Sequence, residues 1–257
     1  MKTKTKNRKR RGNSRYFLFF LLALFLLTGL GFLSWYALTH VGLFALQQVV
    51  VTGNTAIPDS LIQTVATPYL GANLLAIPGR ELKAKINRFS RVKEVKLHKR
   101  LLHTLKIDLV ERKGMLYIKT LEGDLFPVDS EGIILAKYST IYTEDLPIFS
   151  TYFSSNQLKA GVRLKKPALT RILALHKRIM KEAPGFVPYV SEYYLIDNTV
   201  NIVDAVHGTR IIPSEDDLAR QLKRYLFVQE NGNINRKGIV DLRFKNQVVV
   251  KAGDNEK

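Results

Sequence analysis

The spacing of apolar side chains separates one long apolar run near the N-terminus from two units of mixed periodicity. Residues 16–39 contain no charged side chain and are rich in Leu and Phe. At about 1.5 Å per residue a helix of this length covers roughly 36 Å, enough for a hydrocarbon core of ~30 Å. Tyr16 lies at one end and Trp35 and Tyr36 near the other, as aromatic residues do at membrane interfaces. The run predicts a transmembrane helix.

The first unit, residues 44–113, changes from strand to helix periodicity and back. An apolar strand at 46–51 precedes a short helix that starts at 58–60. The apolar side of this helix is predicted to hold Leu61, Ile62, Val65 and Leu70. A second helix covers about 79–89, and alternating strands follow at 95–98 and 105–110. The predicted order is strand, helix, helix, strand, strand.

The second unit, residues 114–253, is richer in strands. The predicted strands are 115–118, 125–128, 133–136, 193–196, 200–203, 209–212, 239–244 and 248–250, the last two as a hairpin. Two long amphipathic helices are predicted at 167–181 and from Ser214 to about Glu230. The whole chain is therefore expected to be α+β: one transmembrane helix, then a mixed unit, then a mainly antiparallel sheet with two long helices. Residues 254–257 form a short tail.

Charge sets the expected orientation of the transmembrane helix. The formal charge is +18, with no cysteine in 257 residues. Eight basic residues precede position 16 without an acid among them: Lys2, Lys4, Lys6, Arg8, Lys9, Arg10, Arg11 and Arg15. The positive-inside rule places tail 1–15 in the cytoplasm and everything after about residue 40 outside. A cleaved signal peptide would have a shorter apolar region and a small-x-small site, so an uncleaved anchor is favoured. Because the membrane explains the tail, a nucleic-acid-binding arm is disfavoured.

Candidate catalytic residues are few, and each has a simpler structural interpretation. The absence of cysteine excludes a thiol nucleophile, a thiolate zinc site and disulfides. His176 lies on an apolar helix face, which favours a core histidine. Ser90 and Lys93 have the S-x-x-K spacing, but the S-D-N and K-T-G motifs that accompany it in penicillin-binding enzymes do not occur. Acids at 215–217 suit a helix start. The sequence predicts no enzyme, no cofactor, no metal site and no small-molecule substrate.

Basic side chains gather on the strands of the first unit. They are Lys93, Lys96, Lys99, Arg100, Arg112 and Lys113. Aromatic residues do not alternate with them, so binding of nucleic acid by base stacking is not predicted. A solvated strand face is the simplest interpretation, and contact with anionic lipid headgroups or an acidic partner is the alternative.

Several stretches, in order, resemble one known family. They are 49–54 (VVVTGN), 71–75 (GANLL), 92–95 (VKEV), 104–112 (TLKIDLVER), 128–134 (VDSEGII), 146–147 (LP) and 240–244 (VDLRF). The first four resemble a POTRA domain, and the ordered set, with the preceding anchor, resembles the bacterial division proteins FtsQ and DivIB. The chain departs from the family pattern at Leu102 and at Lys113-Gly114, where proline is usual, and at Phe244, where tyrosine is usual.

The resemblance implies a non-enzymatic scaffold of the divisome at the division septum, in the cell (inner) membrane, with its outer domains periplasmic or extracytoplasmic. Its implied partners are single-span FtsB-like and FtsL-like proteins, other division proteins and the lipid bilayer. By position, the partner-binding residues are Phe244, Gln247, Val248, Val249 and Val250, at a sheet edge that accepts a strand from the FtsB-like protein. The same valines can also pair within their own sheet, since a strand has two edges. Arg243 is expected to be a structural ion-pair partner.

Two alternatives remain open from the sequence. The first is a POTRA-containing component of a secretion or translocation system, although no repeated alternating strands of a membrane β-barrel follow. The second is a membrane-tethered enzyme that acts on the cell wall, which would need the residues Ser90 and Lys93 or the acids at 215–217 to act in catalysis.

Overall fold

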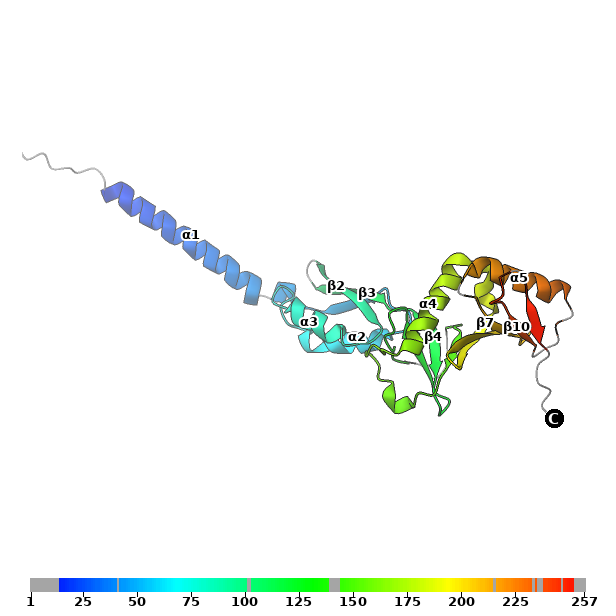
Figure 1. Ribbon diagram of the computed structural model, residues 1–257. Coiled ribbons are helices and arrows are strands. Elements are labelled where there is room, and N and C mark those ends of the chain that lie inside the picture. The colour runs from blue at the N-terminus through cyan, green and yellow to red at the C-terminus, as the bar shows by residue number, and fades with distance from the viewer. Residues whose placement is uncertain are drawn as a thin grey trace, which may run out of the picture.

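The computed structural model describes residues 14–40, 42–100, 103–138, 144–214, 216–232, 234, 238–245 and 247–251. A single long helix leads to two sheets that lie one after the other (Figure 1). Helix α1 (Ser14–His40) contains the stretch Tyr16–Ala37, which is long and apolar enough to cross a membrane and packs against nothing in the described structure.

The smaller, three-stranded sheet has β3 between β1 and β2. Its elements are η1 (Gly42–Phe44), β1 (Gln48–Thr52), α2 (Asp59–Ala66), η2 (Thr67–Tyr69), α3 (Gly79–Ile86), β2 (Val92–Arg100) and β3 (Thr104–Glu111). Strand β3 runs parallel to β1 and antiparallel to β2. The predicted order of strand, helix, helix, strand, strand is confirmed.

Helices α2 and α3 cover one face of this sheet. Leu105, Ile107 and Leu109 alternate along β3 and are buried in the same core as Ile62 of α2 and Leu82 of α3. The prediction for the apolar side of α2 is partly wrong. Leu61 and Leu70 are 37% and 49% exposed. The two-turn helix instead buries Ile62 and Ala66, which are four residues apart and so lie one above the other.

The larger sheet has eight strands in the order β11-β10-β9-β8-β7-β6-β4-β5. The strands are β4 (Gly114–Lys119), β5 (Leu125–Asp129), β6 (Ile148–Ser150), β7 (Val190–Ile196), β8 (Thr199–Asp204), β9 (Arg210–Ile212), β10 (Ile239–Asp241) and β11 (Val249–Lys251). The helices are η3 (Ser155–Gln157), α4 (Pro167–Glu182), η4 (Pro184–Tyr189) and α5 (Leu218–Asn231). Four of the neighbouring pairs, β4–β5, β7–β8, β8–β9 and β10–β11, are antiparallel.

One strand prediction for the second unit is wrong, and one strand was missed. Residues 133–136 form no strand; Ile133 and Ile134 make only single bridges, to Arg163 and Val128. Strand β6 was not predicted, and it lies between β4 and β7, parallel to both. Three residues are too few to show a strand period in the sequence, and the position of β6 is set by its neighbours in the sheet.

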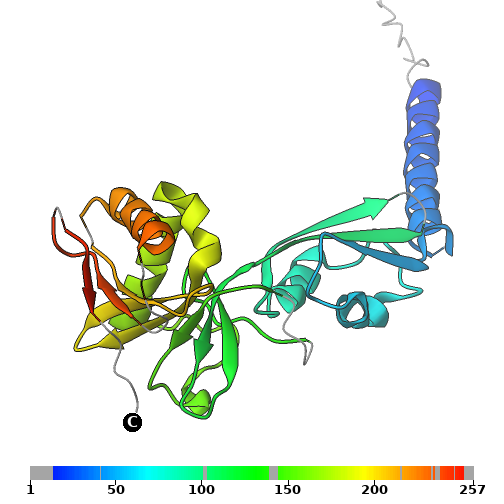
Figure 2. The ribbon, with the colours of Figure 1, turned by 90° about the vertical axis from the view of Figure 1, so that its right-hand side faces the viewer.

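Helices α4 and α5 lie together against the larger sheet (Figure 2). Ile172 and Ile179 from α4 and Leu222 and Tyr225 from α5 are fully buried, in a core shared with Tyr193 of β7. Helix α5 starts four residues later than predicted from Ser214. The Ser214 hydroxyl oxygen accepts a hydrogen bond from Asp216 N–H at 3.2 Å, before the helix begins.

Candidate partner-binding edge and the junction between the sheets

The predicted partner-binding residues lie in the C-terminal hairpin, at one edge of the larger sheet. Strand β11 pairs with β10, with Val240 opposite Val250. No other strand in the described part of the chain pairs with the outer side of β11. Phe244 follows β10, and its C=O accepts from Gln247 N–H at 3.5 Å, which closes the turn. The structure therefore brings all five residues to one place.

Hydrogen bonds between β9 and β10 determine which way the backbone of β10 faces. Arg210 N–H donates to Gly238 C=O at 2.9 Å. Leu242 N–H donates to Ile212 C=O at 2.9 Å. Consecutive residues of a strand direct their backbone groups to opposite sides, so Val240 faces β9 as well.

The remaining residues of β10, Ile239 and Asp241, must then face β11. They lie opposite Lys251 and Val249, which therefore direct their N–H and C=O groups inward, to β10. Val250 directs its N–H and C=O outward. The outer edge thus presents the backbone donor and acceptor of Val250, as an added strand requires.

Apolar side chains accompany this open backbone. Phe244 is 49% exposed and Val250 is 45% exposed. Val248 is half-buried and packs against the core of the larger sheet, which fixes the start of β11. Sheet edges in soluble proteins are usually covered or protected by charge, so exposed apolar residues beside a free edge are typical of a binding surface.

Two polar contacts hold the hairpin from behind. Arg224 of α5 donates to Lys245 C=O at 3.1 Å. Arg243 donates to both carboxylate oxygens of buried Asp241, with Nη2 2.6 Å from Oδ2. The hydrogen bonds from Arg243 lower the pKa of Asp241 below its ordinary value. The prediction that Arg243 is an ion-pair partner is confirmed.

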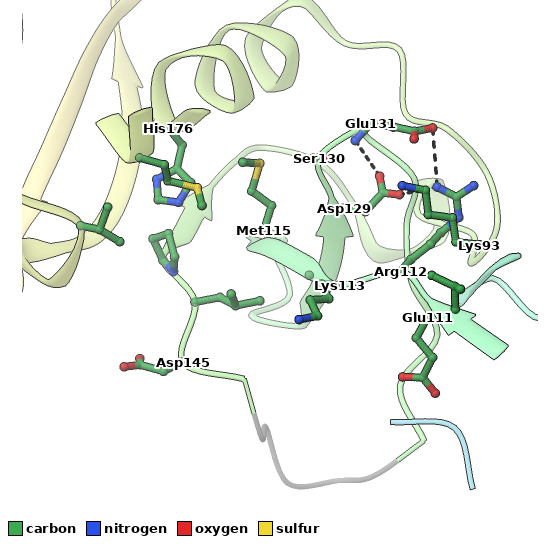
Figure 3. A pocket seen from close by; sticks show the side chains of 16 residues that line it. Lys93, Glu111, Arg112, Lys113, Met115, Asp129, Ser130, Glu131, Asp145 and His176 are labelled. Carbon is green, nitrogen blue, oxygen red and sulfur yellow. Dashed lines mark hydrogen bonds and ion pairs between the residues drawn. The ribbon is translucent and has the colours of Figure 1, made fainter. Parts of the chain in front are cut away.

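The two sheets meet at a cavity of about 510 Å³, to which both contribute side chains (Figure 3). Arg112, which follows β3, lies 2.7 Å from the carboxylate of Asp129 and 3.5 Å from that of Glu131. His176 is buried, and its Nδ1 is 2.7 Å from the Tyr193 hydroxyl oxygen. Burial lowers the pKa of His176, so the ring is neutral near pH 7. Arg112 is thus paired with two acids in the cavity lining, and the prediction of a core histidine is confirmed.

Two of the other candidate residues, Ser90 and Asp217, have structural partners. Ala136 N–H donates to Ser90 Oγ at 2.8 Å, across the junction of the sheets. Asp217 pairs with Arg220 at 2.6 Å at the start of α5. Glu215 lies outside the described residues. Among the described residues no group of three or more His, Asp or Glu side chains is placed to hold a metal ion.

The junction also contains buried polar contacts that the sequence did not indicate. Arg91 is 6% exposed, and its Nε donates to Ala136 C=O at 2.7 Å. Its Nη2 is 3.2 Å from Glu144 Oε2. Arg91 belongs to a segment whose lysines and arginines look equivalent in the sequence, and Glu144 is far along the chain, so no local pattern marks the pair.

Comparison with known proteins agrees with this architecture. Residues 44–112 match the family model described as "POTRA domain, FtsQ-type". Two relatives are named Cell division protein DivIB. The one from Clostridium botulinum strain Hall is 21% identical over 210 residues, which cover 80% of this chain and 81% of the relative. The one from Clostridium botulinum strain Loch Maree is 29% identical over 122 residues, 48% of this chain and 47% of the relative.

The FtsQ-type POTRA match and the similarity to two DivIB proteins support the FtsQ/DivIB family. Members of this family are non-enzymatic cell-division proteins. The FtsQ-type POTRA match ends one residue before Lys113, and β4 begins at Gly114. An FtsQ/DivIB protein with an N-terminal apolar helix fits a single-pass membrane protein of the septum.

Proposed function

We propose that this FtsQ/DivIB protein is a single-pass membrane scaffold of the divisome that recruits an FtsB-like partner by strand addition to β11. Its N-terminal tail lies in the cytoplasm, and its two sheets lie outside. In this role the POTRA-type domain faces upstream division proteins, and the larger sheet holds the FtsB/FtsL-like pair and so connects it to septal peptidoglycan synthesis.

The observation that carries this proposal is the outward-facing backbone of Val250 at the end of an eight-stranded sheet. A partner strand gains main-chain hydrogen bonds from such an edge, and specificity comes from side chains beside it. Phe244 and Val250 supply apolar contact area there. Gln247 is exposed next to them and adds a polar side chain to the same surface.

The orientation rests on charge. The eight basic residues before position 16 favour a cytoplasmic N-terminus. Figure 1 shows α1 at one end of the molecule and β10 at the other. A protein built this way presents β11 far from the membrane surface. The strand that the partner adds to β11 must therefore also lie far from the membrane.

The experiment measures binding of the full chain, reconstituted in lipid nanodiscs, to the extracytoplasmic segment of the FtsB-like protein from the same organism. Val250→Pro removes the outward N–H, and Val250→Ala keeps it while shortening the side chain. We expect Val250→Pro to weaken binding by about tenfold or more, because proline removes a donor and its ring obstructs the partner strand. Val250→Ala should weaken binding by roughly threefold or less, the cost of a few buried methyl groups at a half-exposed position.

Circular dichroism of both variants tests whether the fold is intact. If Val250→Pro binds like the wild type with an unchanged spectrum, strand addition at β11 is wrong. If the wild-type chain itself does not bind, the assignment of an FtsB-like partner is wrong.

A further inference from the structure

The loop between η2 and α3 lies next to the segment that leaves α1. Leu74 N–H donates to Phe44 C=O at 2.7 Å, and Gly71 N–H donates to Leu46 C=O at 2.8 Å. Phe44 is only four residues beyond His40, the last residue of α1. Four residues reach at most about 14 Å even when extended, so the loop lies close to where the helix leaves the bilayer.

This loop exposes two leucines. Leu70 is 49% exposed and Leu75 is 56% exposed. Single exposed leucines are ordinary, but both of these lie on the part of the domain that is hydrogen-bonded to the membrane-proximal segment. Asn73 Oδ1 accepts from Leu75 N–H at 2.9 Å, which holds the second leucine in place.

Basic side chains surround the same loop. The Lys99 ammonium donates to the C=O groups of Leu75 and Ile77 at 2.9 and 3.1 Å, which joins the end of β2 to the loop. Arg100 follows it, and exposed Arg80 lies in the first turn of α3. Glu81, next to Arg80, is 2.7 Å from Lys85. This end of the domain is therefore positively charged.

The sequence suggested that the basic residues of the POTRA-type domain form one strand face. In the structure most of them lie at two opposite ends of the domain. Strand β2 has nine residues and extends over roughly 26 Å. Figure 2 shows that β2 begins next to the larger sheet and ends beside α1. Lys99 and Arg100, the last residues of β2, are therefore at the end beside α1. Lys93 is at the other end and lines the same cavity as Lys113. Only the first group can reach a membrane that holds α1.

We propose that Leu70, Leu75, Arg80, Lys99 and Arg100 form a membrane-facing end that docks on an anionic lipid surface. The leucines enter the headgroup region, and the basic groups attract the lipid phosphates. The inference rests on the membrane anchoring given under Proposed function. Docking holds the POTRA-type domain on the bilayer instead of leaving it on a free tether, and so fixes the direction in which β11 points.

The test uses the full chain in nanodiscs of phosphatidylcholine, with or without phosphatidylglycerol. Because the chain has no cysteine, single variants can be labelled with a nitroxide at one place. The three sites are Leu75→Cys, Leu27→Cys in α1 as a membrane reference, and Leu121→Cys on the larger sheet as an exposed reference. Accessibility of each label to oxygen and to a water-soluble nickel complex reports its depth.

We expect the label at position 75 to be shielded from nickel when phosphatidylglycerol is present, as at position 27, and the label at 121 to remain accessible. If position 75 behaves like 121 while 27 is shielded, the docking proposal is overturned and membrane anchoring stands. If position 27 is itself accessible to nickel, anchoring is overturned and docking with it.

A charge-reversal pair tests the role of the basic groups. Arg80→Glu with Arg100→Glu should shift the label at position 75 toward water, with the equilibrium constant for docking lowered roughly fivefold or more for each basic group removed. The control pair, Lys93→Glu with Lys113→Glu, changes the net charge equally at the opposite end and should leave the label unchanged. Equal effects of the two pairs would overturn the assignment of docking to this end.

Discussion

The guanidinium of Arg91 contacts the carboxylate of Glu144 at the junction of the two sheets, with Nη2 3.2 Å from Oε2. Arg91 precedes β2 in the POTRA-type domain, and Glu144 precedes β6 in the larger sheet. The same guanidinium donates to Ala136 C=O, and Ser90 Oγ accepts from Ala136 N–H. Two neighbouring residues of the first domain thereby hold two separate segments of the second.

Replacing Arg91 with leucine is expected to loosen the junction. The change leaves the Ala136 carbonyl without its donor. The partly buried Glu144 carboxylate loses its ion-pair partner and keeps the Gly114 N–H donor at 3.3 Å. Breaking a buried pair costs about 3 kcal/mol. Nitroxides at Lys83→Cys and Leu121→Cys, one in each domain, would report a broader distance distribution by pulsed electron resonance. Arg88→Leu, at an exposed position, is the control and should keep the narrow distribution. A narrow distribution in Arg91→Leu would show that other contacts fix the junction.

Glu111 makes the stability of the POTRA-type domain dependent on pH. Its carboxylate accepts hydrogen bonds from the Ala56 and Ile57 N–H groups, each at 2.9 Å. Burial alone raises the pKa of Glu111, but these bonds and those from Thr55 outweigh it and lower the pKa below its ordinary value. The carboxylate therefore stabilises the fold fully above the usual glutamate pKa of about 4.3. That contribution is lost as pH falls through the lowered folded value.

The matching variant is Glu111→Gln, which cannot ionise. At pH 7 we expect it to unfold with a free energy about 1 kcal/mol lower than the wild type, because a charged acceptor is lost. Below pH 4 the difference should shrink as the wild-type carboxylate is protonated. Urea unfolding of both proteins between pH 7 and pH 3, monitored by a spectroscopic probe in the three-stranded sheet, measures this difference in unfolding free energy. A difference that does not change with pH would mean that the charge of Glu111 is unimportant.

Gly53 ends β1 at a point where no side chain fits. Its φ is +81°, and a Cβ added there would clash with the Leu109 carbonyl oxygen. Gly53→Ala should cost about 3 kcal/mol or more, since both strain and a backbone clash oppose it. Gly71, with φ +78° and nothing within 4 Å of an added Cβ, is a matched control. Gly71→Ala should cost only about 1–2 kcal/mol. If denaturant unfolding shows that both variants lose the same free energy of unfolding, a clash at Gly53 is ruled out.

Much of the architecture was predictable because its elements are long and regular. Strand β3 alternates buried and half-exposed residues over most of its length, and α4 repeats its buried residues at helical spacing. Strand β6 is too short to show a period, and its place between β4 and β7 depends on contacts distant in sequence. The resemblance to FtsQ and DivIB implied that residues 247–250 lie at a sheet edge. It did not show that the backbone N–H and C=O groups of Val250, and not those of Val249, face outward. This direction follows from the hydrogen bonds between β9 and β10.

Amide exchange at the C-terminal hairpin tests the assigned direction of β11. In the free protein the Val249 and Lys251 amides donate to β10 and should exchange more slowly than the Val250 amide, which faces solvent. Binding of the FtsB-like segment should slow exchange at Val250 and leave Val249 and Lys251 little changed, because the added strand takes the outward donor. Arg243→Gln, which removes the ion pair behind the hairpin, should speed exchange at Val249 by letting β11 separate from β10. If Val250 is the protected amide in the free protein, the edge faces the other way and the residue to mutate is Val249.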